Sequence, residues 1–291
     1  MKVAVVGASG QLGADVSREF RRNGGDVCDL SHSDIEICSL QSVRKALGQA
    51  KPRIIVNTAA MHNVESCEND PLKAYEVNSL GSQNLALFAR QLGAVLAHVS
   101  TDYVFDGSKK APYVEADLAL PLNVYGNTKL AGESFIRATA DKYFILRTSA
   151  LYGTNPCRAK GGRNFVELML KLASEKEELR VVGDEVVSPT STSEVARQIV
   201  TLCQTDHFGL YHATSEGSCT WYEFAARIFD LAGVRTKLKI AAPGEFPAKV
   251  ARPKYSVLEN HALKVLGLNS FLAWDEGLRS YFSSRNNRQF V

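Results

Sequence analysis

A short apolar run near the start of this chain leads into three glycines at three-residue spacing, and no other feature constrains the fold as strongly. The run is VAVV, and the glycines that follow it are Gly7, Gly10 and Gly13. Glycine permits a tight turn between a strand and a helix, and it lets the backbone come close to a ligand. The helix that follows would offer unpaired N–H groups and a positive dipole end to a pyrophosphate. The loop therefore predicts a dinucleotide site, although glycine-rich strand ends also form plain turns.

Apolar runs and amphipathic stretches alternate through the first half of the chain. The runs that we expect to be strands lie at Val3–Val6, Val27–Leu30, Ile54–Asn57, Val95–Val99 and Phe144–Arg147. The stretches that we expect to be helices lie at Gln11–Asn23, Leu40–Ala50, Pro71–Leu92 and Val124–Ala140. Alternation of this kind is typical of a parallel sheet with helices on both faces. We therefore predict an α/β fold with a Rossmann-like, doubly wound parallel sheet.

The second half of the chain has a different rhythm. It begins with a basic, glycine-rich loop at Arg158–Arg163, which a helix at Asn164–Glu177 and a strand at Leu179–Val182 are expected to follow. Two further capped helices are expected at Ser191–Cys203 and Thr220–Ala232. A proline-rich stretch at Ala242–Pro253 and a last helix complete the chain. We expect residues 1–150, with a return segment at about 188–212, to bind the dinucleotide. Residues 151–187 and 213–291 would form a smaller mixed α/β lobe for the substrate.

The composition is that of an ordinary globular protein and excludes several functions. Of the 291 residues, 45% are hydrophobic and 22% are charged, so a sizeable core is available. The 34 basic and 31 acidic side chains leave a net charge of +3 without a long single-sign run, which argues against nucleic acid or an anionic membrane as partner. No apolar run is long enough for a membrane span, and the first apolar run fits a strand better than a signal peptide. The six cysteines form no CxxC pair, which favours a reducing, cytoplasmic location and predicts neither a zinc site nor a disulfide framework.

A tyrosine and a lysine four residues apart open the helix expected at Val124–Ala140. Tyr125 and Lys129 would lie one turn apart on one face of that helix. The ordinary pKa of a tyrosine is about 10, and a neighbouring ammonium lowers it toward neutral pH. Tyr125 would then deliver a proton to a carbonyl oxygen while a bound cofactor delivers hydride to the carbon, and Lys129 would also donate to the nicotinamide ribose. Taken alone, such a pair is typical of a solvated helix surface.

Polar side chains after the strand expected at Val95–Val99 favour the catalytic interpretation. Ser100 and Thr101 follow Val99 directly, and the carboxyl ends of parallel strands line the ligand crevice of an open sheet. A hydroxyl at this place would hold the reacting carbonyl and stabilise its developing negative charge. The plainer alternative is that the two hydroxyls only satisfy backbone groups at a strand end.

The ends of the second and third strands are expected beside the same cofactor. Ser31 follows the second strand, where an acid would bind a free ribose 2′-hydroxyl and an arginine would bind a 2′-phosphate. Asp29 is more typical of a solvated loop residue, so the sequence does not separate NAD from NADP. Ala59 and its small neighbours after the third strand would let a ring or a ribose pass, or would simply pack against a helix.

Seven motifs follow one another in an order that is typical of a known family. They are GASGQLG, VNTAA, STDYVFDG, PLNVYGNTKLAGE, the pair NF, SPTSTSEVA and ARPKYSVL, and they extend over nearly the whole chain. Together they resemble the dTDP-4-dehydrorhamnose reductases of the extended short-chain dehydrogenase superfamily, in which the GxxGxxG spacing is typical. The resemblance implies reduction of the C4 keto group of dTDP-4-dehydrorhamnose by NADPH or NADH, which gives dTDP-L-rhamnose.

The same resemblance implies roles for single residues. It makes Tyr125 the proton donor, Lys129 its cofactor-anchoring partner and Thr101 the hydroxyl of the catalytic triad. Beyond the three glycines, the dinucleotide contacts are expected at Gln11, Leu12, Ser31, Glu36, Ile37, Ala59, Ala60, Met61, His62 and Val99. The substrate contacts are expected at Asp102, Tyr103, Ala150, Asn164, Phe165 and Arg252, together with Thr101.

Three departures from the family pattern leave the identity of the sugar substrate undetermined. Ala150 stands where the family usually has a tryptophan, which removes a flat surface worth about 1 kcal/mol beyond its area. Residues 183–189 lack the usual Asp-Gln pair and glycine, and Met61 replaces a ring-bearing residue. The alternatives are therefore a reductase or an epimerase for a related deoxysugar nucleotide. A further alternative is a non-catalytic regulatory subunit, because the beta subunit of methionine adenosyltransferase is similar to this family.

Metal use and assembly are the least constrained expectations. Some members of the family need magnesium at a dimer contact formed by acidic residues, and others are metal-free. Asp15 is the only candidate ligand that the sequence offers, and a single exposed acid does not define a site. We therefore assign no metal residue, treat Mg²⁺ as unsupported by the sequence, and allow a homodimer.

Overall fold

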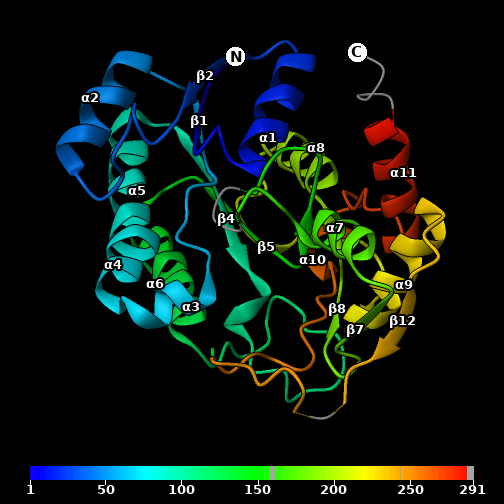
Figure 1. The fold of residues 1–291 in the computed structure, drawn as a ribbon. Helices are drawn as coiled ribbons and strands as arrows, with labels where there is room; N and C mark the ends of the chain where they lie inside the picture. The colour runs from blue at the N-terminus through cyan, green and yellow to red at the C-terminus, as the bar shows by residue number, and fades with distance from the viewer. Residues whose placement is uncertain (158–160, 243, 287–291) are drawn as a thin grey trace.

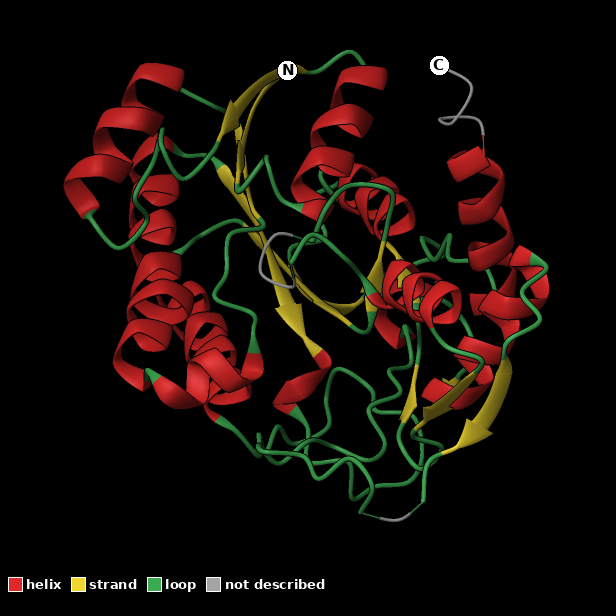
Figure 2. Ribbon diagram, in the orientation of Figure 1, coloured by secondary structure: helices red, strands yellow, loops and turns green. Residues whose placement is uncertain are grey.

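Six parallel strands form the central sheet of the protein, whose computed structural model describes residues 1–157, 161–242 and 244–286. Their spatial order is β10-β5-β4-β3-β1-β2 (Figures 1 and 2). In chain order the strands are β1 (Lys2–Val6), β2 (Asp26–Leu30), β3 (Ile54–Asn57), β4 (Val95–Thr101), β5 (Tyr143–Thr148) and β10 (Gly209–His212). The doubly wound parallel sheet predicted from the sequence is therefore confirmed. The basic loop expected at Arg158–Arg163 lies partly outside the described residues.

Helices cover both faces of the sheet because successive side chains of its strands point to opposite faces, and apolar side chains occur on both. Val3 and Val5 face α1 (Gln11–Arg22), α8 (Thr192–Leu202) and α10 (His261–Val265), whereas Ala4 and Val6 face the opposite helices. Those helices, α2 (Leu40–Ala50), α5 (Gly81–Leu92) and α6 (Val124–Thr139), stand on the other side of the sheet in Figure 1. Burying each large aliphatic side chain contributes about 1.5–3 kcal/mol, so the two-sided pattern fixes the register of the strands that are buried on both faces, such as β1 and β3.

The strand β4 runs two residues further than the apolar run predicts. Ser100 and Thr101 continue the ladder by pairing with Arg147 and Thr148 of β5. Both hydroxyl residues are therefore the last residues of the strand rather than the first of a loop, and η2 (Asp102–Val104) follows them directly. This places their side chains on a rigid element.

The helix predicted at Pro71–Leu92 is interrupted, and a shorter helix precedes it. The structure has α3 (Val64–Asn69), α4 (Pro71–Tyr75), a π-helical turn η1 (Glu76–Leu80) and then α5. The π turn carries the buried Asn78, whose amide bonds the backbone N–H and C=O of Met61, at 2.9 Å each, and Thr128 Oγ1 at 3.0 Å. Tertiary hydrogen bonds that no local pattern reveals accompany this change of helix type.

A smaller lobe packs beside the carboxyl end of the sheet. It holds α7 (Phe165–Glu175), α9 (Trp221–Ala232) and α11 (Trp274–Asn286), which share an aromatic core, on the right of Figure 1. Its strand pairs are β7 (Glu178–Val181) with β12 (Lys237–Ile240), β8 (Val186–Val187) with β11 (Cys219–Thr220), and β6 (Leu151–Tyr152) with β9 (Thr190–Ser191). No helix within the described ranges has the length and apolar character of a bilayer span.

The two caps predicted in the second half have different outcomes. Thr220 and Glu223 form a complete capping box at the start of α9. Ser191 is the N-cap residue of α8, but its hydroxyl bonds Ser193 and makes no capping bond, so that part of the prediction is wrong. Glu194 points inward instead of capping, and it accepts hydrogen bonds from Ser215 and the Leu272 backbone.

A buried ion pair joins β5 to α6 beside the end of β4. Arg147 donates to both carboxylate oxygens of Glu133, at 2.9 and 2.7 Å, and Ser100 Oγ donates to the same carboxylate at 2.5 Å. Both ionic side chains are at most 3% exposed. Such a pair is costly to break because the surviving charge has no water to receive it.

We predict that Arg147→Met lowers the free energy of unfolding by about 3 kcal/mol, because the buried Glu133 then keeps only Ser100 and the half-exposed Arg137, 3.4 Å away, as partners. Urea denaturation followed by circular dichroism measures the loss. The matched control is Arg21→Met, which breaks the half-exposed pair with Asp29 and is expected to have a far smaller effect. Equal losses in the two variants would contradict the assignment.

Candidate active site

A cavity of about 540 Å³ opens at the carboxyl ends of the sheet strands, between the sheet and the smaller lobe. Most of the residues predicted from the sequence line it. They are Gly7, Gly10, Gln11, Leu12, Gly13, Ser31, Glu36, Ile37, Ala59, Ala60, His62, Val99, Thr101, Asp102, Tyr103, Tyr125, Lys129 and Ala150. Met61, Asn164, Phe165 and Arg252 do not line it. The predicted cofactor and catalytic residues therefore share one space.

The glycine loop forms one end of this cavity. Gly7 has φ +82°, and a Cβ on Gly13 would lie 2.2 Å from the Gly7 carbonyl oxygen, so the turn requires both glycines. Helix α1 starts after Gly10 with no side-chain cap and no acid in its first turn. Its N–H groups and the buried, unpartnered Nε2 of Gln11 are thus suited to an anionic group such as a pyrophosphate.

Polar groups surround the part of the cavity near β2. Ser31 lines it and is held by Asp34, which accepts from its N–H at 2.8 Å. Glu36 also lines it, and its carboxylate accepts from the Cys38 N–H. Asp29 is turned to Arg21, 2.6 Å away, and does not line the cavity.

The tyrosine and the lysine lie at the other end, on the first turns of α6. Asn123 caps this helix by accepting from the Gly126 N–H at 2.9 Å. A Cβ on Gly126 would lie 2.2 Å from the Tyr103 carbonyl oxygen, so α6 packs directly against η2. Lys129 is only 2% exposed, and its Nζ donates to the Val99 carbonyl at 2.7 Å.

Burial dominates the electrostatics of this pair. It raises the pKa of Tyr125, while a hydrogen bond with Thr101 opposes the rise. The sequence predicted a pKa lowered by Lys129, and that direction is wrong here because the phenolate would be buried. Burial also lowers the pKa of Lys129 to about 8, against the attraction of Glu133. Tyr125 is therefore held in its protonated form, which is the form a proton donor needs.

Asp102 connects the hydroxyl residues at the end of β4. Its carboxylate accepts from Thr101 Oγ1 at 3.0 Å and from Ser149 Oγ at 2.7 Å. Burial raises its pKa, and these hydrogen bonds lower it. Both oxygens already have protein partners, so Asp102 orients Thr101 at the cavity wall. Tyr103 lines the same wall, with its ring edge to face against Tyr125.

The smaller lobe closes the side of the cavity where a substrate would lie. Ala150 lines it with φ +44°, a strained conformation for a residue with a Cβ. Trp221, at the start of α9, and Glu185 also line it, and Trp221 Nε1 donates to Glu185 at 3.2 Å. Neither residue was predicted from the sequence. The only signal for Glu185 was its place in a stretch that departs from the family pattern.

The four predicted residues outside the cavity have structural roles or neighbour it. The backbone of Met61 is bound by Asn78, and Asn164 caps α7 while donating to the Gly153 carbonyl at 2.7 Å. Phe165 packs on Trp221, with ring centroids 4.6 Å apart, and so supports the wall from behind. Burial raises the pKa of Glu185, and the charge of the exposed Arg252 opposes that rise.

Asp15, the only candidate metal ligand in the sequence, is buried rather than exposed. Its carboxylate accepts from Arg18, from Asn155 and from Thr192, and it joins α1 to α8 and to the loop after β6. Across the residues that the structure describes, no group of three metal-binding side chains occurs. Asp15 therefore fixes the packing of these elements.

A parallel sheet with an uncapped glycine loop at one end of a cavity and a Tyr–Lys pair at the other defines a nicotinamide-dependent oxidoreductase of the short-chain dehydrogenase type. Within that class the chain belongs to the family of the RmlD substrate binding domain, whose model matches residues 1–286. The family resemblance predicted from the sequence is thereby confirmed.

Individual relatives match over nearly the whole chain. The spore coat polysaccharide biosynthesis protein SpsK of Bacillus subtilis is 41% identical over 98% of both chains. A crystal structure of a dTDP-4-dehydrorhamnose reductase from Clostridium acetobutylicum has a TM-score of 0.94 and 38% identity, over 98% of this chain and 100% of that one. The Bacillus anthracis enzyme of the same name, in complex with NADP, has a TM-score of 0.93 and 36% identity over the same shares.

We predict that Gly13→Ala weakens dinucleotide binding at least about tenfold, ~1.4 kcal/mol, because the new Cβ forces the loop away from Gly7. Titration of NADPH fluorescence measures the dissociation constant. Gly48→Ala is the matched control, since a Cβ on this α2 residue meets only Phe88, at 3.8 Å. Unchanged binding by Gly13→Ala would remove the loop from the cofactor site.

Proposed function

We propose that this protein reduces the C4 keto group of dTDP-4-dehydrorhamnose to give dTDP-L-rhamnose, with NADPH or NADH as the hydride source. The observation that carries the proposal is the shared cavity, which has the glycine loop at one end and Tyr125, Thr101 and the buried Lys129 at the other. The family of the chain and the names of its relatives support the same activity.

The cofactor would lie along the carboxyl ends of β1, β2, β3 and β4. The glycine loop would hold the pyrophosphate, with the adenosine beside Ser31, Glu36 and Ile37. Ala59, Ala60 and His62 would flank the middle of the molecule, and Lys129 would hold the nicotinamide ribose. When bound, the nicotinamide supplies the hydride that forms the new C–H bond at C4.

The protein's own contribution to the reduction is a proton. Tyr125 donates its phenol proton to the C4 oxygen, so that the carbonyl becomes an alcohol. Thr101 would position that oxygen once its hydroxyl proton, which Asp102 accepts in the free enzyme, turns to the substrate, and burial keeps the phenol protonated until the transfer.

The same proposal assigns the cofactor and the nucleotide sugar to different parts of the chain. Residues 1–150 and 188–212 would serve the cofactor, and residues 151–187 and 213–291 would bind the nucleotide sugar. Asn164, Phe165 and Arg252 would then act around Trp221 and Glu185 rather than within the cavity. The cysteine pattern supports a cytoplasmic enzyme, and a homodimer is its proposed assembly.

We predict that Tyr125→Phe lowers kcat about a hundredfold or more with the fold retained, because the C4 oxygen loses its proton donor. Oxidation of NADPH in the presence of dTDP-4-dehydrorhamnose measures the rate. Tyr113→Phe is the matched control, because this tyrosine stacks on Phe105 and does not line the cavity. A Tyr125→Phe enzyme with normal kcat would refute the mechanism.

Ala150 favours one second candidate, a reductase for a related 4-keto-6-deoxy sugar nucleotide. Without the family's usual tryptophan, the wall beside Glu185 and Trp221 has room for a different sugar face. A panel of such sugar nucleotides, assayed with both cofactors, tests this directly. Fastest turnover of dTDP-4-dehydrorhamnose supports the first candidate, fastest turnover of another keto sugar supports the second, and no turnover of any of them contradicts both.

A further inference from the structure

The amine of Lys129 contacts a buried histidine as well as a backbone carbonyl. Nζ lies 3.1 Å from His98 Nε2, in addition to its 2.7 Å hydrogen bond to Val99. His98 lies on β4 and is completely buried, and Lys129 is 2% exposed. A buried histidine beside a buried lysine requires a definite arrangement of protons, because buried polar groups must be satisfied mainly by one another.

The amide of Asn57 determines which nitrogen of His98 carries the proton. Asn57 Oδ1 accepts from the Ala59 backbone N–H at 3.1 Å, so its Nδ2 is the atom that faces His98 Nδ1, at 3.0 Å. The amide nitrogen is only a donor, and His98 Nδ1 must therefore accept. Burial also holds the pKa of His98 well below its ordinary value, so the ring is neutral and carries its proton on Nε2.

A proton on Nε2 is directed at Lys129 Nζ. An ammonium group has three donors and no acceptor, so it would place a donor against a donor at 3.1 Å. A neutral amine has a lone pair that accepts from Nε2–H while one of its own protons goes to Val99. We propose that His98, held in one tautomer by Asn57, is a positioning residue for Lys129 and favours the neutral amine in the free enzyme.

The other groups around Lys129 are consistent with this arrangement. Glu133, one turn further along α6, raises the pKa of the lysine, but its carboxylate is already shared by Arg147 and Ser100. Cys67 of α3 also raises it, yet burial raises the pKa of this thiol to about 11, so it carries no charge at neutral pH. Tyr125, one turn earlier on α6, is kept protonated by burial.

The pairing of His98 with Lys129 has a consequence for the proposed reaction. This consequence rests on the proposed function, because it takes Lys129 to be part of the active site. A lysine with a pKa of about 8 changes its charge within the working pH range of an enzyme, and it can thus take up or release a proton near Tyr125. His98 and Asn57 set that balance without contacting the substrate. They do so through hydrogen bonds between β3, β4 and α6.

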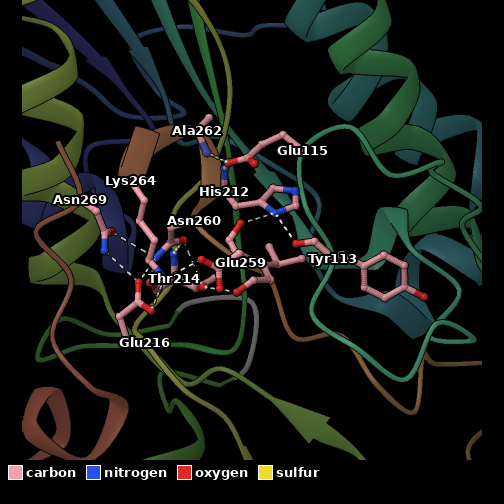
Figure 3. Close-up of polar contacts among 11 residues, drawn as sticks. Tyr113, Glu115, His212, Thr214, Glu216, Glu259, Asn260, Ala262, Lys264 and Asn269 are labelled. Carbon is pink, nitrogen blue, oxygen red and sulfur yellow. Dashed lines mark hydrogen bonds and ion pairs between the residues drawn. The ribbon is translucent and has the colours of Figure 1, made fainter. Parts of the chain in front are cut away.

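Nuclear magnetic resonance of ¹⁵N-labelled histidine tests the tautomer in the free enzyme without any substrate. Above pH 8, where Lys129 is neutral, His98 is expected as the Nε2–H tautomer, with its signal assigned by its loss in His98→Asn. His212 provides an internal control that is expected in the other tautomer, with its proton on Nδ1. That nitrogen donates to the carbonyls of Tyr113 and Glu259 at 3.0 and 3.1 Å (Figure 3). An Nδ1–H tautomer or an imidazolium at His98 would overturn the proposal.

Asn57→Asp reverses the donor pattern with almost no change in shape. A carboxylate at residue 57 would accept from His98 Nδ1–H, which leaves Nε2 as an acceptor for an ammonium on Lys129. We expect the titration midpoint of Lys129, read from the ¹³C signal of its side chain, to rise by about one pH unit or more. His212→Asn, a change at an equally buried histidine of β10, is expected to leave that midpoint unchanged.

The outcomes separate this inference from the proposed function. An unchanged or lower midpoint in Asn57→Asp contradicts the role of His98, whatever substrate the enzyme uses. A raised midpoint supports it, even if dTDP-4-dehydrorhamnose is not turned over, when His98 in the same variant is found as the Nδ1–H tautomer. A raised midpoint with His98 still in the Nε2–H tautomer contradicts it, because the new carboxylate then acts on Lys129 by charge alone. A shift of equal size in His212→Asn would also contradict it, because the effect would then follow from general loosening of the sheet.

Discussion

The burial of Lys129 is the constraint on which the rest of the site depends. A long cationic side chain is stable in an apolar interior only if hydrogen bonds or a lowered charge replace its hydration. Here the end of β4 supplies a carbonyl and a histidine ring, and the close approach of α6 brings the amine to both. Gly132 makes that approach possible, since a Cβ there would lie 2.4 Å from the Asn78 carbonyl oxygen. The position of Tyr125 follows, because it lies one turn before the lysine on the same rigid helix.

Much of the fold was predictable from the sequence because its signals are local. The strands of the first half alternate or are continuously apolar, and Ile54–Asn57 and Leu40–Ala50 have the predicted bounds. The helix α3 was missed because only one of its six residues, Cys67, is buried. The π turn at Glu76–Leu80 depends on the tertiary contacts of Asn78, which leave no periodic trace.

Much of the site was also predictable from the sequence, because its main signals are local. Tyr125, Lys129 and the glycine loop are read from spacing, and the cavity contains all of them. Trp221 and Glu185 reach the cavity from the smaller lobe, far along the chain, so their place in its wall follows from packing that the sequence does not show. The pKa direction of Tyr125 was wrong because a helical spacing reports a neighbouring charge but not burial.

Transfer of a labelled hydride tests the central claim most directly. The enzyme would be incubated with dTDP-4-dehydrorhamnose and NADPH that carries deuterium at both hydrogen positions of the nicotinamide C4, and the product would be examined by nuclear magnetic resonance. The account predicts one deuterium on C4 of the sugar, with the new hydroxyl proton exchangeable with solvent. Deuterium at any other carbon, or a product whose C4 hydrogen comes from water, would contradict it.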